Sequence, residues 1–256
     1  MISLLDSPAA RTAILGAVTG LALASLPACG TRSLPPAASE SDPYLAARQA
    51  MVEQGVVAWG IEDPAVIEAM SVVPRHEFVP QEFLDQAYEN HPLPIGLGQT
   101  ISQPYIVALM SEQADIQPED NVLEIGTGSG YQAAILSHLS SRVYTIEILE
   151  ELAASAAERF SRLGYGSIHT RHADGFGGWP EQAPFDAILV TAAPDHVPPP
   201  LLEQLAVGGV MVVPIGPVGG YQELWRIERL EDGQIRATSL GGVRFVPLLR
   251  AQELGS

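Results

Sequence analysis

The sequence predicts an α/β fold with a doubly wound, mostly parallel sheet and an antiparallel edge at its C-terminal end. Across the second half of the chain, apolar strands alternate with helical segments, and this alternation produces a parallel sheet with right-handed crossovers. A glycine-rich turn at residues 126–130 joins the first of these strands to a helix, as in doubly wound sheets that bind ligands. A length of 256 residues and a hydrophobic content of 46% suffice for one such domain.

The strands and helices of the predicted sheet follow one another from residue 121 onward. Strands are expected at about 121–125, 142–147, 167–172, 185–191 and 208–215, and helices at about 129–139 and 149–163. Two further apolar segments, 223–227 and 243–248, flank a turn at Asp232-Gly233. They predict an antiparallel pair on the edge of the sheet.

A smaller helical part precedes the sheet. Helical spacing of apolar residues extends over 44–59 and 65–70, and a third helix is expected from Ser102, with a proline in its first turn. Prolines in 73–80, and glycines and prolines in 88–100, rule out a long regular element between these helices. So long an irregular stretch with many apolar residues is usually functional.

The N-terminal end of the chain has the composition of an export signal. An apolar run of about 14 residues, Ala13–Leu26, is too short for a transmembrane helix and has the length of a signal-peptide core. The only cysteine, Cys29, follows a small residue, as at the cleaved and acylated site of bacterial lipoproteins. We therefore expect a signal peptide at 1–28, a lipid anchor on Cys29 and a flexible linker at 29–43, which favours the cell envelope over the cytoplasm. The alternative is a start codon assigned too far upstream.

Charge and cysteine content exclude several classes of function. The net charge is −17, and 13 basic residues form no cluster of the kind that binds a phosphate backbone, so no nucleic acid is expected as a partner. Six scattered histidines and one cysteine provide neither a zinc site nor a disulfide framework. No metal is expected.

The glycine-rich turn indicates which ligand the sheet binds. It has the form E-x-G-x-G-x-G, with Glu124 two residues before Gly126, whereas nicotinamide and flavin loops use G-x-G-x-x-G to hold a pyrophosphate. Glu147 ends the next strand 21 residues after Gly126, the distance at which an acid reaches ribose hydroxyls. A ribose without a phosphate suits S-adenosylmethionine. The alternative, a tight turn that binds nothing, is disfavoured because three glycines in five residues cost helix propensity.

Three other segments fall where open α/β sheets bind ligands, at the ends of strands. Asp174-Gly175 follows the third strand, and an acid there can accept a hydrogen bond from an adenine amino group. The small side chains of residues 190–194 follow the fourth strand and leave room for a substrate. Residues 100–105 precede the first strand and are placed to close over the methyl group.

With these segments assembled, the chain resembles the protein-L-isoaspartate O-methyltransferase family from about Tyr44 to Leu249. The most specific agreement lies in residues 174–179 and 183–188, Asp-Gly-Phe-Gly-Gly-Trp and Ala-Pro-Phe-Asp-Ala-Ile. Residues 93–96, 100–104 and 244–248 add independent agreement. Ala173 departs from the pattern, because a glycine is common there.

The resemblance implies a class I S-adenosylmethionine-dependent methyltransferase domain over 44–256, with a helical addition at 44–117, acting as a monomer. The reaction would be methylation of the free α-carboxylate of L-isoaspartyl residues, with D-aspartyl residues as further acceptors, in damaged proteins and peptides. Ser102 is the implied catalytic residue. The implied cofactor-binding residues are Glu124, Gly126, Thr127, Gly128, Gly130, Glu147, Asp174 and Gly175. The implied substrate-binding residues are Ile101, Thr191, Ala192, Ala193, Val246 and Pro247.

Alternatives remain at the level of the sequence. Taken without the resemblance, Ser102 is better explained as a helix N-cap before Pro104. A carboxyl methyltransferase with another acceptor, or a non-catalytic exported binding module on the same fold, fits the same motifs. A serine hydrolase does not fit, because Ser129 lacks the flanking glycines of G-x-S-x-G.

Overall fold

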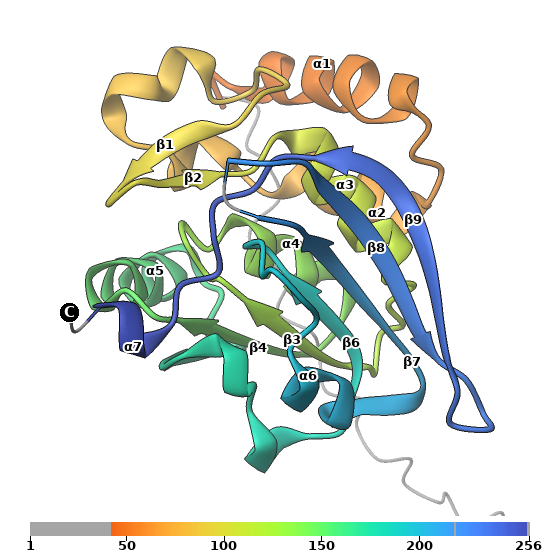
Figure 1. Ribbon diagram of the computed structural model, residues 1–256. Coiled ribbons are helices and arrows are strands. Elements are labelled where there is room, and N and C mark those ends of the chain that lie inside the picture. Colours follow the sequence, from red (N-terminus) through yellow and green to blue (C-terminus); the bar gives the residue numbers. More distant parts are fainter. Residues whose placement is uncertain (1–41, 218, 255–256) are drawn as a thin grey trace, which may run out of the picture. The chain divides into compact units, whose positions relative to one another are not determined.

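Seven strands form the central sheet of the protein in the order β5-β4-β3-β6-β7-β8-β9 (Figure 1). The computed structural model describes residues 42–217 and 219–254. The strands are β3 (Asn121–Ile125), β4 (Arg142–Glu147), β5 (Ile168–His172), β6 (Phe185–Val190), β7 (Leu205–Ile215), β8 (Gln222–Arg229) and β9 (Ile235–Val243). The pairings from β5 to β7 are parallel, and β8 and β9 add antiparallel pairings. The predicted fold class is confirmed.

Both faces of the sheet are buried at its central strands. Neighbouring residues of β3, Val122 and Leu123, belong to two different core clusters, because successive side chains point to opposite faces. One cluster includes residues of the N-terminal helices, of α4 (Tyr131–Leu139) and of α5 (Glu150–Leu163), and the other includes Leu201 of α6 (Pro199–Gln204). Burial on both faces explains why these strands are continuous apolar runs in the sequence.

The N-terminal part consists of short helices and one hairpin. Its elements are α1 (Leu45–Gly55), η1 (Val57–Trp59), α2 (Pro64–Val72), η2 (Arg75–Phe78), η3 (Gln81–Gln86), β1 (Leu93–Gly96), β2 (Gln99–Ile101) and α3 (Pro104–Gln113). The stretch 88–100, expected to be irregular, contains the antiparallel pair β1–β2. The strands were missed because they are only four and three residues long.

Local sequence explains where two of the helices begin and end. Asp63 caps α2, since its side chain accepts hydrogen bonds from the amides of Ala65 and Val66, and a proline follows at the first helical position. Helix α5 carries two glutamates in its first turn, where the positive end of the helix dipole stabilises negative charge. It ends at Gly164 in the left-handed conformation, with φ of 83°.

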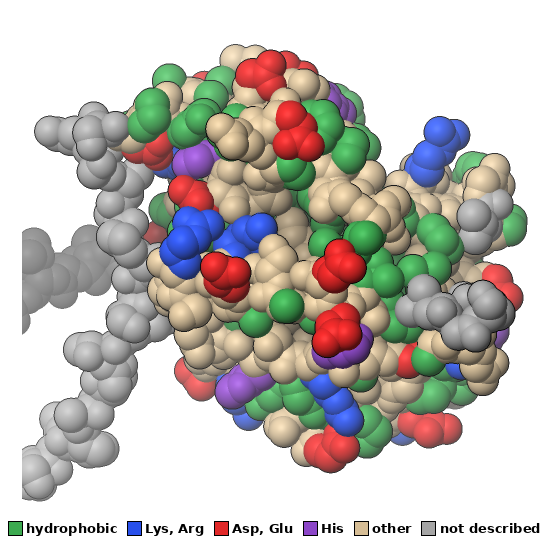
Figure 2. All heavy atoms as spheres, turned by 90° about the vertical axis from the view of Figure 1, so that its left-hand side faces the viewer, with side chains coloured by type: hydrophobic (Ala, Val, Ile, Leu, Met, Phe, Trp, Pro, Cys, Tyr) green, Lys and Arg blue, Asp and Glu red, His purple; other side chains and the backbone are tan. Residues whose placement is uncertain are grey.

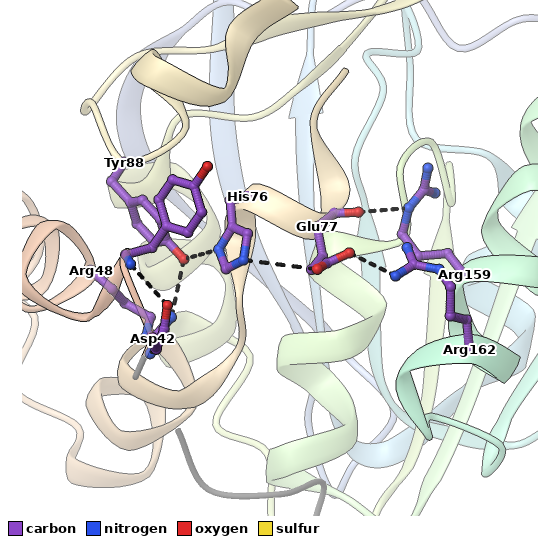
Figure 3. A network of polar contacts seen from close by, with 8 residues as sticks. Asp42, Arg48, His76, Glu77, Tyr88, Arg159 and Arg162 are labelled. Carbon is purple, nitrogen blue, oxygen red and sulfur yellow. Dashed lines mark hydrogen bonds and ion pairs between the residues drawn. The ribbon is translucent and has the colours of Figure 1, made fainter. Parts of the chain in front are cut away.

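Polar contacts hold the N-terminal helices together (Figure 3). Arg48, a buried residue of α1, donates to Asp42 at 2.6 Å and to the Tyr88 hydroxyl at 3.2 Å. His76 Nδ1 lies 2.7 Å from the same hydroxyl, and burial lowers the pKa of His76. The buried guanidinium is therefore compensated by one carboxylate and one phenol.

The last expected strand lies elsewhere than predicted. The partner of β8 is β9 (Ile235–Val243), not the segment 243–248. The turn around Asp232-Gly233 is closed by a hydrogen bond from the amide of Leu230 to Gln234, so the returning strand begins directly after it. Strand β9 is an edge strand with few buried side chains, and it lacks the apolar alternation that marks a strand.

The segment 244–250 crosses the ends of the parallel strands. Ala193 donates to the carbonyl of Val246 at 2.8 Å and accepts from Leu248 at 2.9 Å, forming an isolated bridge with Pro247. The apolar residues of segment 244–250 therefore lie at the end of the sheet where open α/β sheets bind ligands, rather than in an edge strand. No helix within the described ranges is long and apolar enough to cross a membrane. The predicted signal peptide, Cys29 anchor and most of the predicted linker lie outside the described residues.

Candidate active site

A cavity lies at the carboxyl ends of the central parallel strands, where the strand order reverses between β3 and β6. We call it the donor cavity. Its lining comes from Gln99–Ser102, Glu124–Ser129, Ile146–Leu149 and Val246–Leu249, with Val107, Tyr131, Gln132, Gly175, Thr191 and Ala192. Most residues that the sequence predicted for the site, including Ile101, Thr127 and Pro247, are thus brought together.

Glycines shape the loop between β3 and α4. Gly126 and Gly130 adopt φ of 102° and 89°, which other residues rarely adopt. A Cβ on Gly126 would lie 2.6 Å from Thr191 Oγ1, and one on Gly130 would lie 2.6 Å from the Phe160 ring. A positive φ is what a tight strand-to-helix turn requires at such positions. The space that a side chain would fill at these two positions is occupied by protein atoms rather than left for a ligand.

Glu147 presents its carboxylate at the end of β4. One oxygen accepts a hydrogen bond from the Gly128 amide at 2.7 Å, and the other accepts from Ile148 and Leu149, both at 3.0 Å. The side chain is buried and lines the donor cavity. Three amides fix the carboxylate and join it to the glycine loop.

Glu124 lies one strand away, in the wall of the same cavity. Thr145 donates to its Oε2 at 2.5 Å, and Thr145 in turn lies 2.6 Å from the hydroxyl of Thr127. Its Oε1 is buried and has no hydrogen-bond partner in the part of the chain that the structure describes. Burial raises the pKa of Glu124 to about 8, and the nearby Glu147 adds to the rise.

Ser102 occupies the turn between β2 and α3. Its carbonyl accepts a hydrogen bond from Arg75 Nη2 at 2.8 Å, and no hydrogen bond to its hydroxyl occurs among residues 42–217 and 219–254. The N-cap of α3 is Gln103, which makes no side-chain cap. The alternative role of Ser102 as an N-cap is therefore wrong, and its hydroxyl is available to a ligand.

A second cavity adjoins the first. It has a volume of about 420 Å³ and extends from Ser102 and Ile106 to Tyr221 and the segment 242–246. We call it the acceptor cavity. Thr100, Ser102, Thr191 and Val246 line both cavities, so the two meet at these residues.

Three of the predicted site residues do not line the donor cavity. Gly130 packs against Phe160, and Ala193 bridges to Pro247. Asp174 accepts hydrogen bonds from the amides of Phe176 at 2.9 Å and Ala251 at 3.0 Å, and it pairs with Arg250 at 3.4 Å. Each of the three thus contacts other protein groups next to the cavity wall.

Comparisons with known proteins agree with this geometry. The family model "Protein-L-isoaspartate(D-aspartate) O-methyltransferase" matches residues 46–253. The protein-L-isoaspartate O-methyltransferase of a Picosynechococcus species is 53% identical over 208 residues, which are 81% of this chain and 92% of the relative. Protein-L-isoaspartate O-methyltransferase 1 of Nitrosospira multiformis is 55% identical over 207 residues, 80% of this chain and 88% of the relative.

The chain belongs to the protein-L-isoaspartate (D-aspartate) O-methyltransferase family. A solved protein-L-isoaspartate O-methyltransferase structure has a TM-score of 0.72 at 29% identity, over 78% of this chain and 65% of that one. A Plasmodium falciparum structure, described as a protein-L-isoaspartate O-methyltransferase with S-adenosyl-L-homocysteine, has a TM-score of 0.69 at 24% identity. It covers 81% of this chain and 99% of that one, and it supports the fold.

Sequence reasoning missed several residues that shape the site of this methyltransferase. Arg75 is fully buried, donates to the carbonyls of Ala87 and Ser102, and lies 4.8 Å from the centroid of the Tyr131 ring. Arg159 of α5 donates to the carbonyl of Ser129 in the glycine loop at 2.9 Å. An arginine surrounded by backbone carbonyls has no sequence signature, because its partners are not side chains.

Arg159 also joins the glycine loop to the N-terminal part (Figure 3). Its Nε donates to the carbonyl of Glu77 at 2.9 Å, while the Glu77 carboxylate pairs with Arg162 at 2.7 Å.

Within the described ranges, no group of three or more His, Cys, Asp or Glu side chains could hold a metal ion.

Proposed function

We propose that this protein transfers a methyl group from S-adenosylmethionine to the free α-carboxylate of L-isoaspartyl residues in damaged proteins and peptides, the first step of their repair. D-Aspartyl residues are a further acceptor, in accord with the family description. One observation carries the proposal: Ser102, whose hydroxyl has no partner among the residues that the structure describes, lies where the donor and acceptor cavities meet. A donor and an acceptor bound in the two cavities would react at that point.

The donor cavity suits the methyl donor. A carboxylate offers about four lone-pair sites, and Glu147 uses three of them on backbone amides, which leaves acceptor capacity for a ribose hydroxyl. We assign Thr127, Gly128 and Gly175 to the rest of the donor site. We also assign Asp174 to the adenine amino group, a role that requires its carboxylate to exchange a present amide partner for the ligand.

The chemistry asks little of the protein beyond positioning. When bound, the donor supplies a methyl carbon that is already electrophilic on a sulfonium. The acceptor α-carboxylate has a reference pKa of about 3.3–3.7, so it is ionised at neutral pH and needs no general base. The Ser102 hydroxyl donates to one carboxylate oxygen and turns the other toward the methyl carbon. Such orientation is worth about 7–11 kcal/mol of the barrier at most.

A peptide assay tests the proposal. Matched peptides with L-isoaspartate or L-aspartate at one position are incubated with labelled donor, and methyl incorporation is counted. We expect incorporation into the isoaspartyl peptide and a much slower rate for the aspartyl peptide. Ser102→Ala should lower turnover about tenfold or more, since a hydrogen bond to a charged group is worth about 1.5–3 kcal/mol. Donor affinity, measured by calorimetry, should stay the same.

Three outcomes would contradict the proposal. Equal methylation of both peptides would favour a carboxyl methyltransferase with another acceptor. Donor binding without methyl transfer to any peptide would favour a non-catalytic binding module. An unchanged turnover of Ser102→Ala would remove the role assigned to its hydroxyl.

We further propose that Cys29 is the acylated N-terminus of an exported, monomeric form of the enzyme. The proposal is supported by the apolar run and the chain's single cysteine, together with a family match that begins only at residue 46. Sedimentation equilibrium of residues 42–256 checks the monomeric state.

A further inference from the structure

Arg244 differs from every other arginine that the structure describes. The chain has no lysine, and its 13 basic residues are all arginines. Each other arginine in the ranges 42–217 and 219–254 donates a hydrogen bond to a carbonyl or pairs with a carboxylate. Arg244 is exposed and has neither kind of partner there. The chain has 30 acidic residues, so an arginine that pairs with no carboxylate in the described ranges calls for an explanation.

Arg244 lies in the wall of the acceptor cavity. The four residues that line both cavities mark the place where the methyl group is transferred. Arg244 and Tyr221 line the acceptor cavity but not the donor cavity. We therefore take the carboxylate bound at Arg244 to be a different one from the carboxylate that Ser102 orients.

The surroundings of Arg244 suit an acidic side chain on a peptide. Tyr221 is 71% exposed, and its ring forms an apolar wall of the same cavity. The Tyr221 hydroxyl donates a hydrogen bond at 3.3 Å to Glu223, which is not a lining residue of the cavity. Gly242 adds backbone without a side chain. A planar guanidinium in a cavity that also has an aromatic side chain and open backbone in its wall can bind a carboxylate with two parallel hydrogen bonds.

The charge of the protein gives a physical reason for an arginine that binds an acidic peptide side chain. Acidic side chains are spread over the face seen in Figure 2, and a net charge of −17 repels acidic peptides at a distance. A single unpaired cation within the acceptor cavity offsets that repulsion locally.

We propose that Arg244 binds the side-chain carboxylate of an Asp or Glu residue that neighbours the isoaspartyl residue of the acceptor. The inference rests on the proposed function, because it takes the second cavity to hold the peptide. It makes Arg244 a specificity-determining residue, with acidic flanking positions as its ligand.

The test compares isoaspartyl peptides that carry Glu or Gln at each neighbouring position in turn. For one position, the wild type should show a KM for the Glu peptide about two- to fivefold lower than for the Gln peptide, as expected for one exposed ion pair. Arg244→Gln should abolish this preference. Arg244→Lys should keep part of it. The matched control is Arg236→Gln on β9, which removes another exposed arginine, one that pairs with Glu228 outside the cavity.

Binding separates this proposal from the proposed function. Fluorescence anisotropy of labelled peptides, with S-adenosylhomocysteine present, reports the Glu-over-Gln preference without turnover. Loss of that preference in Arg244→Gln but not in Arg236→Gln supports the assignment, whether or not methyl transfer follows. Equal affinity for the two peptides at every position, or equal effects of both variants, overturns it. Methyl transfer to neither peptide contradicts the proposed function alone.

Discussion

Glu124 is an acid in the wall of the donor cavity that burial keeps protonated. The pKa of this side chain is about 8 in the folded protein, against a reference value of 4.5. Between these two values the folded state holds a proton that the unfolded chain has released. Stability from this group is thus complete below the unfolded pKa and is lost as the pH rises through the folded pKa.

The expected consequence is a pH-dependent stability that one substitution removes. For the wild type, the free energy of unfolding should fall by at most about 1.4 kcal/mol per pH unit between about pH 5 and pH 8, then level off. Glu124→Gln keeps the shape and cannot ionise, so its curve should lack this slope. Urea unfolding at several pH values measures both curves. Parallel curves would show that Glu124 is ionised in the folded state.

At the scale of elements, Arg75 joins η2 to the turn that carries Ser102. It donates to the carbonyls of Ala87 at 2.9 Å and Ser102 at 2.8 Å, while its Nη1 has no hydrogen-bond partner in the part of the chain that the structure covers. Burial lowers the pKa of Arg75 to about 10, so it remains charged at neutral pH. A buried guanidinium that binds two backbone carbonyls fixes the distance between the segments that carry them.

Arg75 is accordingly a positioning residue, and Arg75→Lys should disturb the turn that carries Ser102 without leaving a large cavity in the core. One ammonium cannot bridge both carbonyls, so we expect kcat to fall about tenfold, with the donor Kd unchanged. Arg48→Lys is the matched control, because Arg48 is equally buried but contacts Ser71, Tyr88 and Asp42 instead of Ser102. If Arg75→Lys and Arg48→Lys lose equal amounts of kcat and equal amounts of thermal stability, the role of Arg75 is only structural.

Elements differ in how far the sequence could predict them, and burial decides the difference. Strand β3 was predicted with its observed ends because it is buried on both faces, and its apolar run stops at the glycine loop. Strand β9 was misplaced because an exposed edge strand needs no alternation. The glycine loop, Glu147 and Ser102 were found through motifs. Arg75 was not, since it acts on backbone carbonyls. Arg244 begins the matching segment 244–248, but its place in the site is marked only by the absence of a partner among the described residues.

At the scale of the whole molecule, our proposal divides the chain into an export leader and an enzyme. The family match spans 46–253, so the apolar run Ala13–Leu26 and Cys29 lie before it. A diacylated cysteine would anchor the enzyme, since each buried methylene contributes about 0.8 kcal/mol to membrane binding. Residues 30–43 are rich in Ser, Pro and Ala, a composition that suits a tether.

The leader proposal predicts where the enzyme is found in its native host. Mass spectrometry of the membrane fraction should detect a mature chain that begins at an acylated Cys29. Cys29→Ala should remain as the unprocessed precursor, because the thiol that accepts the lipid is gone, while methyl transfer by the purified variant should equal that of the wild type, since Cys29 precedes the whole family match. An intact Met1, or a chain that starts near Met51, in the soluble fraction would refute export and favour the cytoplasmic alternative.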